Sequence, residues 1–181
     1  MQRKEILIHG WDFAYDIEGW YPPLKAALKG VDFKEAQWKP DGKSSHTIGE
    51  LVDHLMYYKK RFLFRLDQKD WTVIIGSNDE TFHTTQYATP EEWNNAVAEL
   101  GSVHQNIRER LIRLEDGDLD ALLPKDPIGG QVLTLLMHDA YHTGQIILLR
   151  KLYGSWPAVE TRNRGFIYKP ESKTSIHIAR S

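Results

Sequence analysis

Residues 131–153 read QVLTLLMHDAYHTGQIILLRKLY and give the strongest structural signal in the sequence. Apolar residues recur along it at intervals of three and four, which is the period of an amphipathic α-helix. Gly154 follows the last periodic residue and Pro157 stands shortly after it, a pattern typical of a helix end. The stretch therefore predicts a helix over about residues 131–153.

One face of this helix carries polar residues at positions that the period assigns to the core. Burying an imidazole or amide without a partner costs about 1–3 kcal/mol. This face has three such groups in succession, the side chains of His138, His142 and Gln145. They indicate that a metal ion or a polar pocket satisfies all three together. The face reads Leu135, His138, His142, Gln145, Leu149 and Leu152.

Two more helices are predicted at about residues 47–66 and 90–114. Each begins with a Thr-x-x-Glu capping box, at Thr47 and at Thr89, in which the two side chains satisfy free backbone N–H groups. Pro90 adds a residue that suits the first helical position. The apolar face of the later helix reads Trp93, Val97, Leu100, His104, Ile107, Leu111 and Leu114.

A further helical period covers about residues 6–28, and Pro22-Pro23 must kink or split that helix, because proline lacks a backbone donor. Trp11, Tyr15 and Trp20 are expected mostly in the core, with one or two of these rings at the mouth of a pocket. The predicted apolar face consists of Phe13, Ile17, Trp20, Leu24 and Ala27.

Four amphipathic helices without a convincing strand pattern predict an all-α four-helix bundle. The connection over residues 70–88 is longer than a tight hairpin needs, so it allows a crossover that makes the second and third helices parallel. Residues 71–75 inside it are expected to form a short strand or an extended packing arm. We expect one domain over residues 1–181, with a C-terminal tail over 155–181 that packs on the bundle or on a partner.

Composition excludes several classes of function. The 181 residues include 23 Lys+Arg and 25 Asp+Glu, a net charge of -2 that does not suit nucleic-acid binding. The chain has no Cys, which excludes disulfides, Cys-type zinc sites and a cysteine nucleophile. The N-terminus lacks a signal-peptide apolar region, and no run of about 18 apolar residues occurs. We therefore expect a cytoplasmic protein with no membrane partner.

The metal ligands predicted from the helical faces are His54, His138 and His142. The last two stand at i and i+4, so both imidazoles can reach one ion, and His54 lies on or beside the apolar face of the 47–66 helix. His104 is interpreted as a hydrogen-bonded core-edge residue, with a fourth ligand as the alternative. The other four histidines, at positions 9, 46, 83 and 177, are expected at the surface.

Two polar residues are expected to line the pocket beside this site, one helical turn from a ligand. They are Tyr58, after His54, and Gln145, after His142. Hydrogen bonding within the bundle is the alternative role for both. Tyr141 and Arg150 lie outside the apolar face and are expected at the surface or at an interface.

The segment from His138 to Pro157 resembles the C-terminal helix of the DinB/YfiT-like metalloenzyme superfamily, above all in its H-x-x-x-H-x-G-Q core. His54 in the segment 47–54 is similar to the first metal histidine of that family, and Trp38-Lys39-Pro40 also resembles the family pattern. The resemblance covers about residues 11–157. It implies an up-down-down-up bundle that binds Zn²⁺ or Ni²⁺ through His54, His138 and His142.

The resemblance also implies a class of reaction. Characterised relatives include enzymes that conjugate or isomerise small-molecule substrates with low-molecular-weight thiols such as bacillithiol or mycothiol, and homodimers are common among them. Three functions are therefore considered: a metal-dependent thiol S-transferase, a metal-dependent hydrolase, and a noncatalytic bundle that binds metal or a small ligand. No residue is assigned as a general acid or base.

Overall fold

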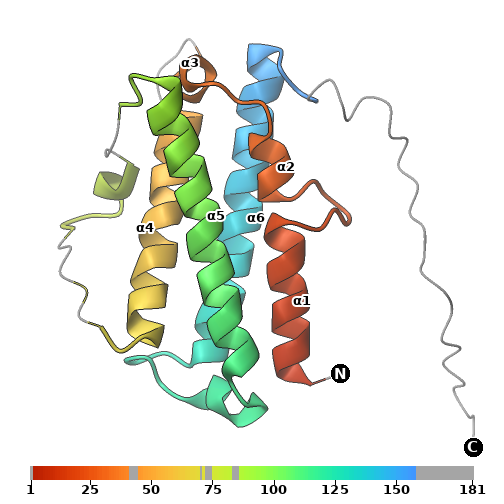
Figure 1. Cartoon of the computed structure of the whole chain (residues 1–181), viewed down its shortest axis with the longest axis vertical. Coiled ribbons are helices and arrows are strands. Elements are labelled where there is room, and N and C mark those ends of the chain that lie inside the picture. Colours follow the sequence, from red (N-terminus) through yellow and green to blue (C-terminus); the bar gives the residue numbers. More distant parts are fainter. Residues whose placement is uncertain (1, 41–44, 70, 72–74, 83–85, 158–181) are drawn as a thin grey trace, which may run out of the picture.

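The computed structural model describes residues 2–40, 45–69, 71, 75–82 and 86–157, and within them it is helical with no named strand. Figure 1 shows a bundle of four long helices. These are α1 (Arg3–Tyr15), α4 (Ile48–Leu66), α5 (Pro90–Arg113) and α6 (Ile128–Tyr153). The shorter elements are α2 (Leu24–Leu28), α3 (Phe33–Ala36), η1 (Asp79–Phe82) and η2 (Asp116–Asp120). The predicted all-α bundle is confirmed.

The bundle has the expected up-down-down-up topology. In Figure 1, α1 rises from the N-terminus, α4 and α5 both descend, and α6 rises again. The connection between α4 and α5 returns from one end of the bundle to the other and includes η1. Of the predicted extended segment 71–75, residues 72–74 lie outside the described part, as do residues 158–181 of the tail.

The first predicted helix is split in two, and part of its expected apolar face is wrong. α1 ends at Tyr15, and α2 begins directly after Pro23, whose ring and missing donor do not fit a helix interior. Ile17 and Trp20 fall in the link between these helices, where they are 45% and 99% exposed. The 3.6-residue period places side chains on one face only while the helix continues.

The expected helix starts at Thr47 and Thr89 are present with their capping boxes. Thr47 Oγ1 accepts a hydrogen bond from the Glu50 backbone N–H at 3.0 Å, while the Thr47 N–H donates to the Glu50 carboxylate at 2.7 Å. Thr89 and Glu92 repeat the arrangement. α6 begins three residues earlier than predicted, at Ile128, and ends at Tyr153. Gly154 caps it with a φ of 92°, a left-handed conformation that glycine tolerates.

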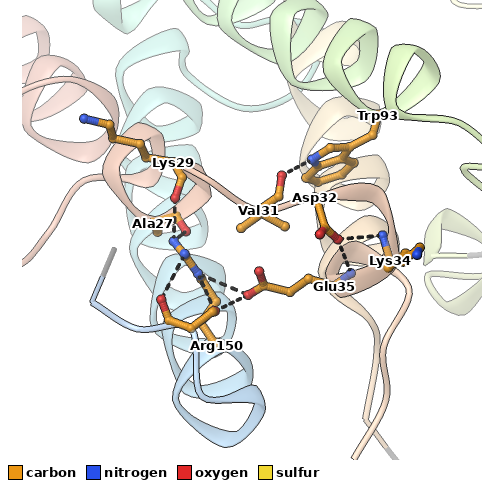
Figure 2. A network of polar contacts seen from close by, with 9 residues as sticks. Ala27, Lys29, Val31, Asp32, Lys34, Glu35, Trp93 and Arg150 are labelled. Atoms are coloured by element: carbon orange, nitrogen blue, oxygen red, sulfur yellow. Dashed lines mark hydrogen bonds and ion pairs between the residues drawn. The ribbon is translucent and has the colours of Figure 1, made fainter. Parts of the chain in front are cut away.

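Arg150 is a correction, because it is 1% exposed rather than at the surface. Figure 2 shows its guanidinium between α6 and the link from α2 to α3. Nη1 donates to the backbone oxygens of Ala27 and Lys29 at 2.8 and 3.0 Å, and Nε lies 3.3 Å from the Glu35 carboxylate and 3.2 Å from Ser155 Oγ. A buried charge is stable in a core only when such partners surround it.

Leu152 is a second correction at this end of α6, since it was expected on the buried face but is 58% exposed. The buried face turns through Leu149 and Arg150 instead. Within the described residues, none of the helices combines the length and the apolar character that crossing a membrane takes.

Candidate metal centre

Three histidines from two helices meet in the bundle. His54 comes from α4, and His138 and His142 come from adjacent turns of α6. The Nε2 atom of His138 lies 2.8 Å from Nε2 of His54 and 3.0 Å from Nε2 of His142. The ligand atoms of all three lie within 4.8 Å of one another, which makes a group that could hold a metal ion. The structure thus brings together the three residues that the helical faces singled out.

Hydrogen bonds at the far side of two rings set their tautomers. His142 Nδ1 lies 2.7 Å from the amide oxygen of Gln145, which can only accept, so Nδ1 carries the proton. His54 Nδ1 is hydrogen-bonded to the Thr81 hydroxyl, which donates its own proton to the carbonyl oxygen of Asn78 at 2.5 Å. Both rings therefore present an Nε2 lone pair to the third histidine. Metal-binding histidines are oriented in this way.

The close approach of these three nitrogen atoms leaves one electrostatically unfavourable contact. When neutral, His54 and His142 can only accept at Nε2, and His138 has a single Nε2 proton that it can donate to one of them. The remaining N···N contact then brings two lone pairs together at hydrogen-bond distance. A cation among the three nitrogens removes that repulsion, and imidazole nitrogen is a preferred ligand of Zn²⁺ and of Ni²⁺.

The protonation states agree with this arrangement. Burial, with the charges of neighbouring imidazoles, lowers the pKa of His54 to about 3 and that of His138 to about 4. Burial also lowers the pKa of His142. All three rings are therefore neutral at physiological pH, which is the form that coordinates a metal.

A cavity of about 490 Å³ opens beside the three histidines. Tyr58 and Gln145, the two predicted pocket residues, both line it. The Tyr58 hydroxyl donates to the Asn78 side-chain oxygen at 2.8 Å, and its ring meets those of His54 and His138 edge-on. Gln145 also forms a hydrogen bond with His142, so it both lines the cavity and bonds within the bundle.

Several lining residues were not foreseen, and His46 is a correction, because it was expected at the surface. His46 is half-buried and lines the cavity. Its ring stacks on that of Phe82, and the Phe82 ring stacks in turn on that of His54, with 3.8 Å between the ring centroids in both pairs. Phe82 belongs to η1 in the crossover, which has no helical period to reveal it. The other lining residues that sequence reasoning missed are Asn78, Asp79, Thr134 and Tyr141.

His104 lies outside the three-histidine group, in a separate buried cluster. Its ring is stacked between Trp11 and Tyr15, at 4.5 and 4.4 Å, and its Nδ1 lies 3.3 Å from Lys59 Nζ. The Lys59 ammonium in turn pairs with the Asp139 carboxylate at 2.5 Å, both side chains having no exposed area. Asp139 is therefore engaged with Lys59 and not with the three histidines. The sequence analysis did not identify Lys59 as a buried residue. Its place on the apolar face of α4, between Leu55 and Phe62, could have indicated a buried charge with a partner.

Two carboxylates of the first helical segment form ion pairs away from the three histidines. Asp12 pairs with Arg108, and Asp16 pairs with Lys25 at 2.8 Å. Asp79 is the one carboxylate among the lining residues of the described cavity.

Acidification is expected to destabilise the metal-free protein. The lowered pKa values of His54 and His138 mean that the unfolded chain binds more protons than the folded chain below the ordinary value of 6.5. The free energy of unfolding should therefore fall as the pH drops from about 6.5 toward 4. Urea unfolding of chelator-treated protein at several pH values measures this, and a His54→Asn variant should show a shallower fall. Equal stability throughout that range would contradict the expectation.

Comparison with known proteins agrees with the geometry. The model of the DinB superfamily matches residues 23–146, more than half of the chain and a range that contains all three histidines. No curated protein and no solved structure matches the chain. The extent of the family match, together with an up-down-down-up bundle that carries a three-histidine group, leaves one assignment: the chain belongs to the DinB superfamily.

Proposed function

We propose that the protein is a metal-dependent thiol S-transferase. The observation that carries the proposal is the convergence of three neutral imidazole Nε2 atoms beside a cavity of about 490 Å³. Three neutral ligands leave the charge of a divalent ion uncompensated and a coordination position open, which is typical of catalytic rather than structural zinc. The volume is in the range of small-molecule sites, about 300–1,000 Å³.

Zn²⁺ or Ni²⁺ held by His54, His138 and His142 would act as a Lewis acid that favours the thiolate form of a bound thiol. The chain has no cysteine, so the thiol comes from a small cosubstrate. Its sulfur forms a bond to an electrophilic carbon of the second substrate, its proton passes to solvent, and the leaving group departs with the electrons of the bond that breaks.

The residues around the histidines suit the positioning of two small substrates. Gln145 and Thr81 hold two of the ligand rings in place. Tyr58 and Asn78 put a hydroxyl and an amide in the cavity wall, where they can hydrogen-bond to polar groups of a substrate. The rings of Phe82 and Tyr141 supply apolar wall.

The test mixes protein purified without an affinity tag and loaded with Zn²⁺ or Ni²⁺ with bacillithiol or mycothiol and an electrophile such as monochlorobimane. Mass spectrometry measures the conjugate. We expect conjugation that disappears with chelator or with His142→Asn and falls with Tyr58→Phe. Formation of conjugate at the rate of the chelated control would overturn the proposal.

Hydrolysis is the second candidate, and Asp79 favours it, because a carboxylate in the cavity can serve as a general base. A panel of ester and amide substrates separates the two. Metal-dependent product release that Asp79→Asn abolishes, without conjugation, would replace the transferase by a hydrolase. Bound metal without either activity would indicate a noncatalytic bundle.

A further inference from the structure

The ring of His46 lies beside a carboxylate at the start of α4. His46 directly precedes the N-cap Thr47, and its Nδ1 atom lies 3.6 Å from Oε2 of Glu50, one helical turn further on. Glu50 is held in place by the capping box, because Oε2 accepts from the Thr47 backbone N–H at 2.7 Å and Oε1 accepts from Lys39 Nζ at 3.1 Å. Burial acts to raise the pKa of Glu50, but these hydrogen bonds outweigh it and lower the pKa, so the carboxylate is charged.

This charged carboxylate sets the tautomer of the His46 ring. A carboxylate can only accept, so the proton of the neutral ring is on Nδ1, and Nε2 carries a lone pair. Among the residues that the structure describes, none forms a hydrogen bond with Nε2, and Nε2 is not one of the buried polar atoms that lack a partner. The Nε2 lone pair is therefore accessible to a molecule in the cavity that His46 lines.

Stacking holds the same ring from its face. The planes of His46 and Phe82 are 9° apart, and those of Phe82 and His54 are also 9° apart. The Phe82 ring thus connects His46 to the three-histidine group, to which His46 itself does not belong. His46 is fixed beside the candidate metal centre without being one of its ligands.

His46 is the group of the cavity wall best suited to accept a proton. The Nε2 atoms of the three clustered histidines face one another, and the Tyr58 hydroxyl donates to Asn78. Asp79 also lines the cavity, but a carboxylate is a weaker base than an imidazole, and a general base works best when its pKa lies near the working pH.

The pair of Glu50 and His46 has the arrangement that activates weak nucleophiles. In that arrangement a base accepts the proton of the nucleophile, and a third group orients the base. His46 supplies the base and Glu50 the orienting carboxylate. The chain has no cysteine, so the nucleophile is the thiol of the cosubstrate.

We propose that His46 is the general base of the reaction and that Glu50 positions it, an inference that rests on the proposed function. The S–H bond of a thiol in the cavity breaks, its proton passes to Nε2 of His46, and its electron pair stays on sulfur. Sulfur then bonds to the electrophilic carbon, and the leaving group departs with the electrons of the bond that breaks. The proton moves from Nε2 to solvent, so no oxidant or reductant is needed.

Conjugation with thiols of different acidity tests this role. With bacillithiol or mycothiol, both alkyl thiols, His46→Asn should lower kcat about 10²–10⁴-fold, the usual contribution of a general base. With 4-nitrothiophenol, which is already ionised at neutral pH, the same variant should leave kcat unchanged, because no proton has to be removed. Loss of packing at His46 would slow both thiols alike. Metal content measured on the same samples shows whether the metal centre is intact.

Glu50→Gln tests the positioning role. Glutamine also completes a capping box, so the start of α4 is preserved while the charge beside Nδ1 is lost. We expect a smaller loss than with His46→Asn, again confined to the alkyl thiols. Glu92→Gln is the matched control, because it makes the same change in the capping box of α5, whose residues do not line the cavity. It should affect neither thiol.

NMR of ¹⁵N-histidine protein loaded with Zn²⁺ gives a readout that needs no activity. In mildly alkaline solution His46 should be the Nδ1–H tautomer, and Glu50→Gln should raise the share of Nε2–H. An Nε2–H ring in the unaltered chain would overturn the proposal. Conjugation that His46→Asn leaves unchanged, or slows equally with both kinds of thiol, would overturn it while the proposed function stands. Absence of conjugation by the unaltered chain would overturn both.

Discussion

His142→Asn protein is expected to emerge from purification with essentially no bound metal, whereas the unaltered chain carries one divalent ion per subunit. The substitution removes one of the three Nε2 atoms that converge in the bundle, and two imidazoles do not fill a tetrahedral site. Gln145→Met should have a smaller effect, because it leaves the ligand and removes only the partner of its Nδ1 atom. Loss of such an outer partner lowers metal affinity about 10–100-fold.

Metal content by mass spectrometry and competition with a chromogenic chelator measure these differences. His46→Asn is the matched control, because His46 lines the same cavity but does not belong to the three-histidine group. It should retain one metal ion per subunit. Full occupancy in His142→Asn protein would mean that the three histidines do not form the metal site.

Asp139→Leu is expected to destabilise the fold by about 3–5 kcal/mol, the usual cost of leaving one partner of a buried ion pair alone. Both members of the Lys59–Asp139 pair are fully buried. Burial lowers the pKa of Lys59 and the Asp139 charge opposes that effect, so removal of the carboxylate favours loss of the Lys59 proton. Lys59→Met should destabilise to a similar extent, because burial raises the pKa of Asp139 in the same manner.

The double variant Lys59→Met/Asp139→Leu distinguishes a buried pair from a packing defect. We expect it to be near the stability of the unaltered chain, since apolar residues of similar size often replace buried ion pairs without loss. Urea unfolding of the four proteins gives the coupling energy. The exposed pair of Asp16 and Lys25 is the control, and Asp16→Asn should cost no more than about 1 kcal/mol. Additive losses in the double variant would contradict the expectation.

The parts of the fold that the sequence predicted are those specified by neighbouring residues. Thr47 with Glu50 and Thr89 with Glu92 form their capping boxes within four residues, so no distant contact is needed to locate these helix starts. The period of α6 similarly identified the histidine face. Trp20 shows where this reasoning fails, because the apolar residues keep a helical spacing across a link in which the backbone is no longer helical.

The parts that the sequence did not predict depend on contacts between distant segments. Arg150 is charged, and its burial depends on partners that include the backbone oxygens of residues 27 and 29 and the Glu35 carboxylate, all far from it in the sequence. Phe82 and Thr81 reach the three-histidine group from a crossover whose sequence has no helical period. The three clustered histidines could be selected from helical spacing, whereas most residues of the cavity wall could not.

The up-down-down-up topology distributes the residues of the site between long core helices and a surface connection. The three clustered histidines stand on long helices that pack in the core, whereas Asn78, Asp79 and Phe82 belong to the connection between α4 and α5. Surface connections tolerate substitution and changes in length better than packed helices do. Under the proposed function, substrate preference can therefore change through residues 78–82 while the three histidines stay fixed, which makes this short segment the natural target for redesign of the bundle.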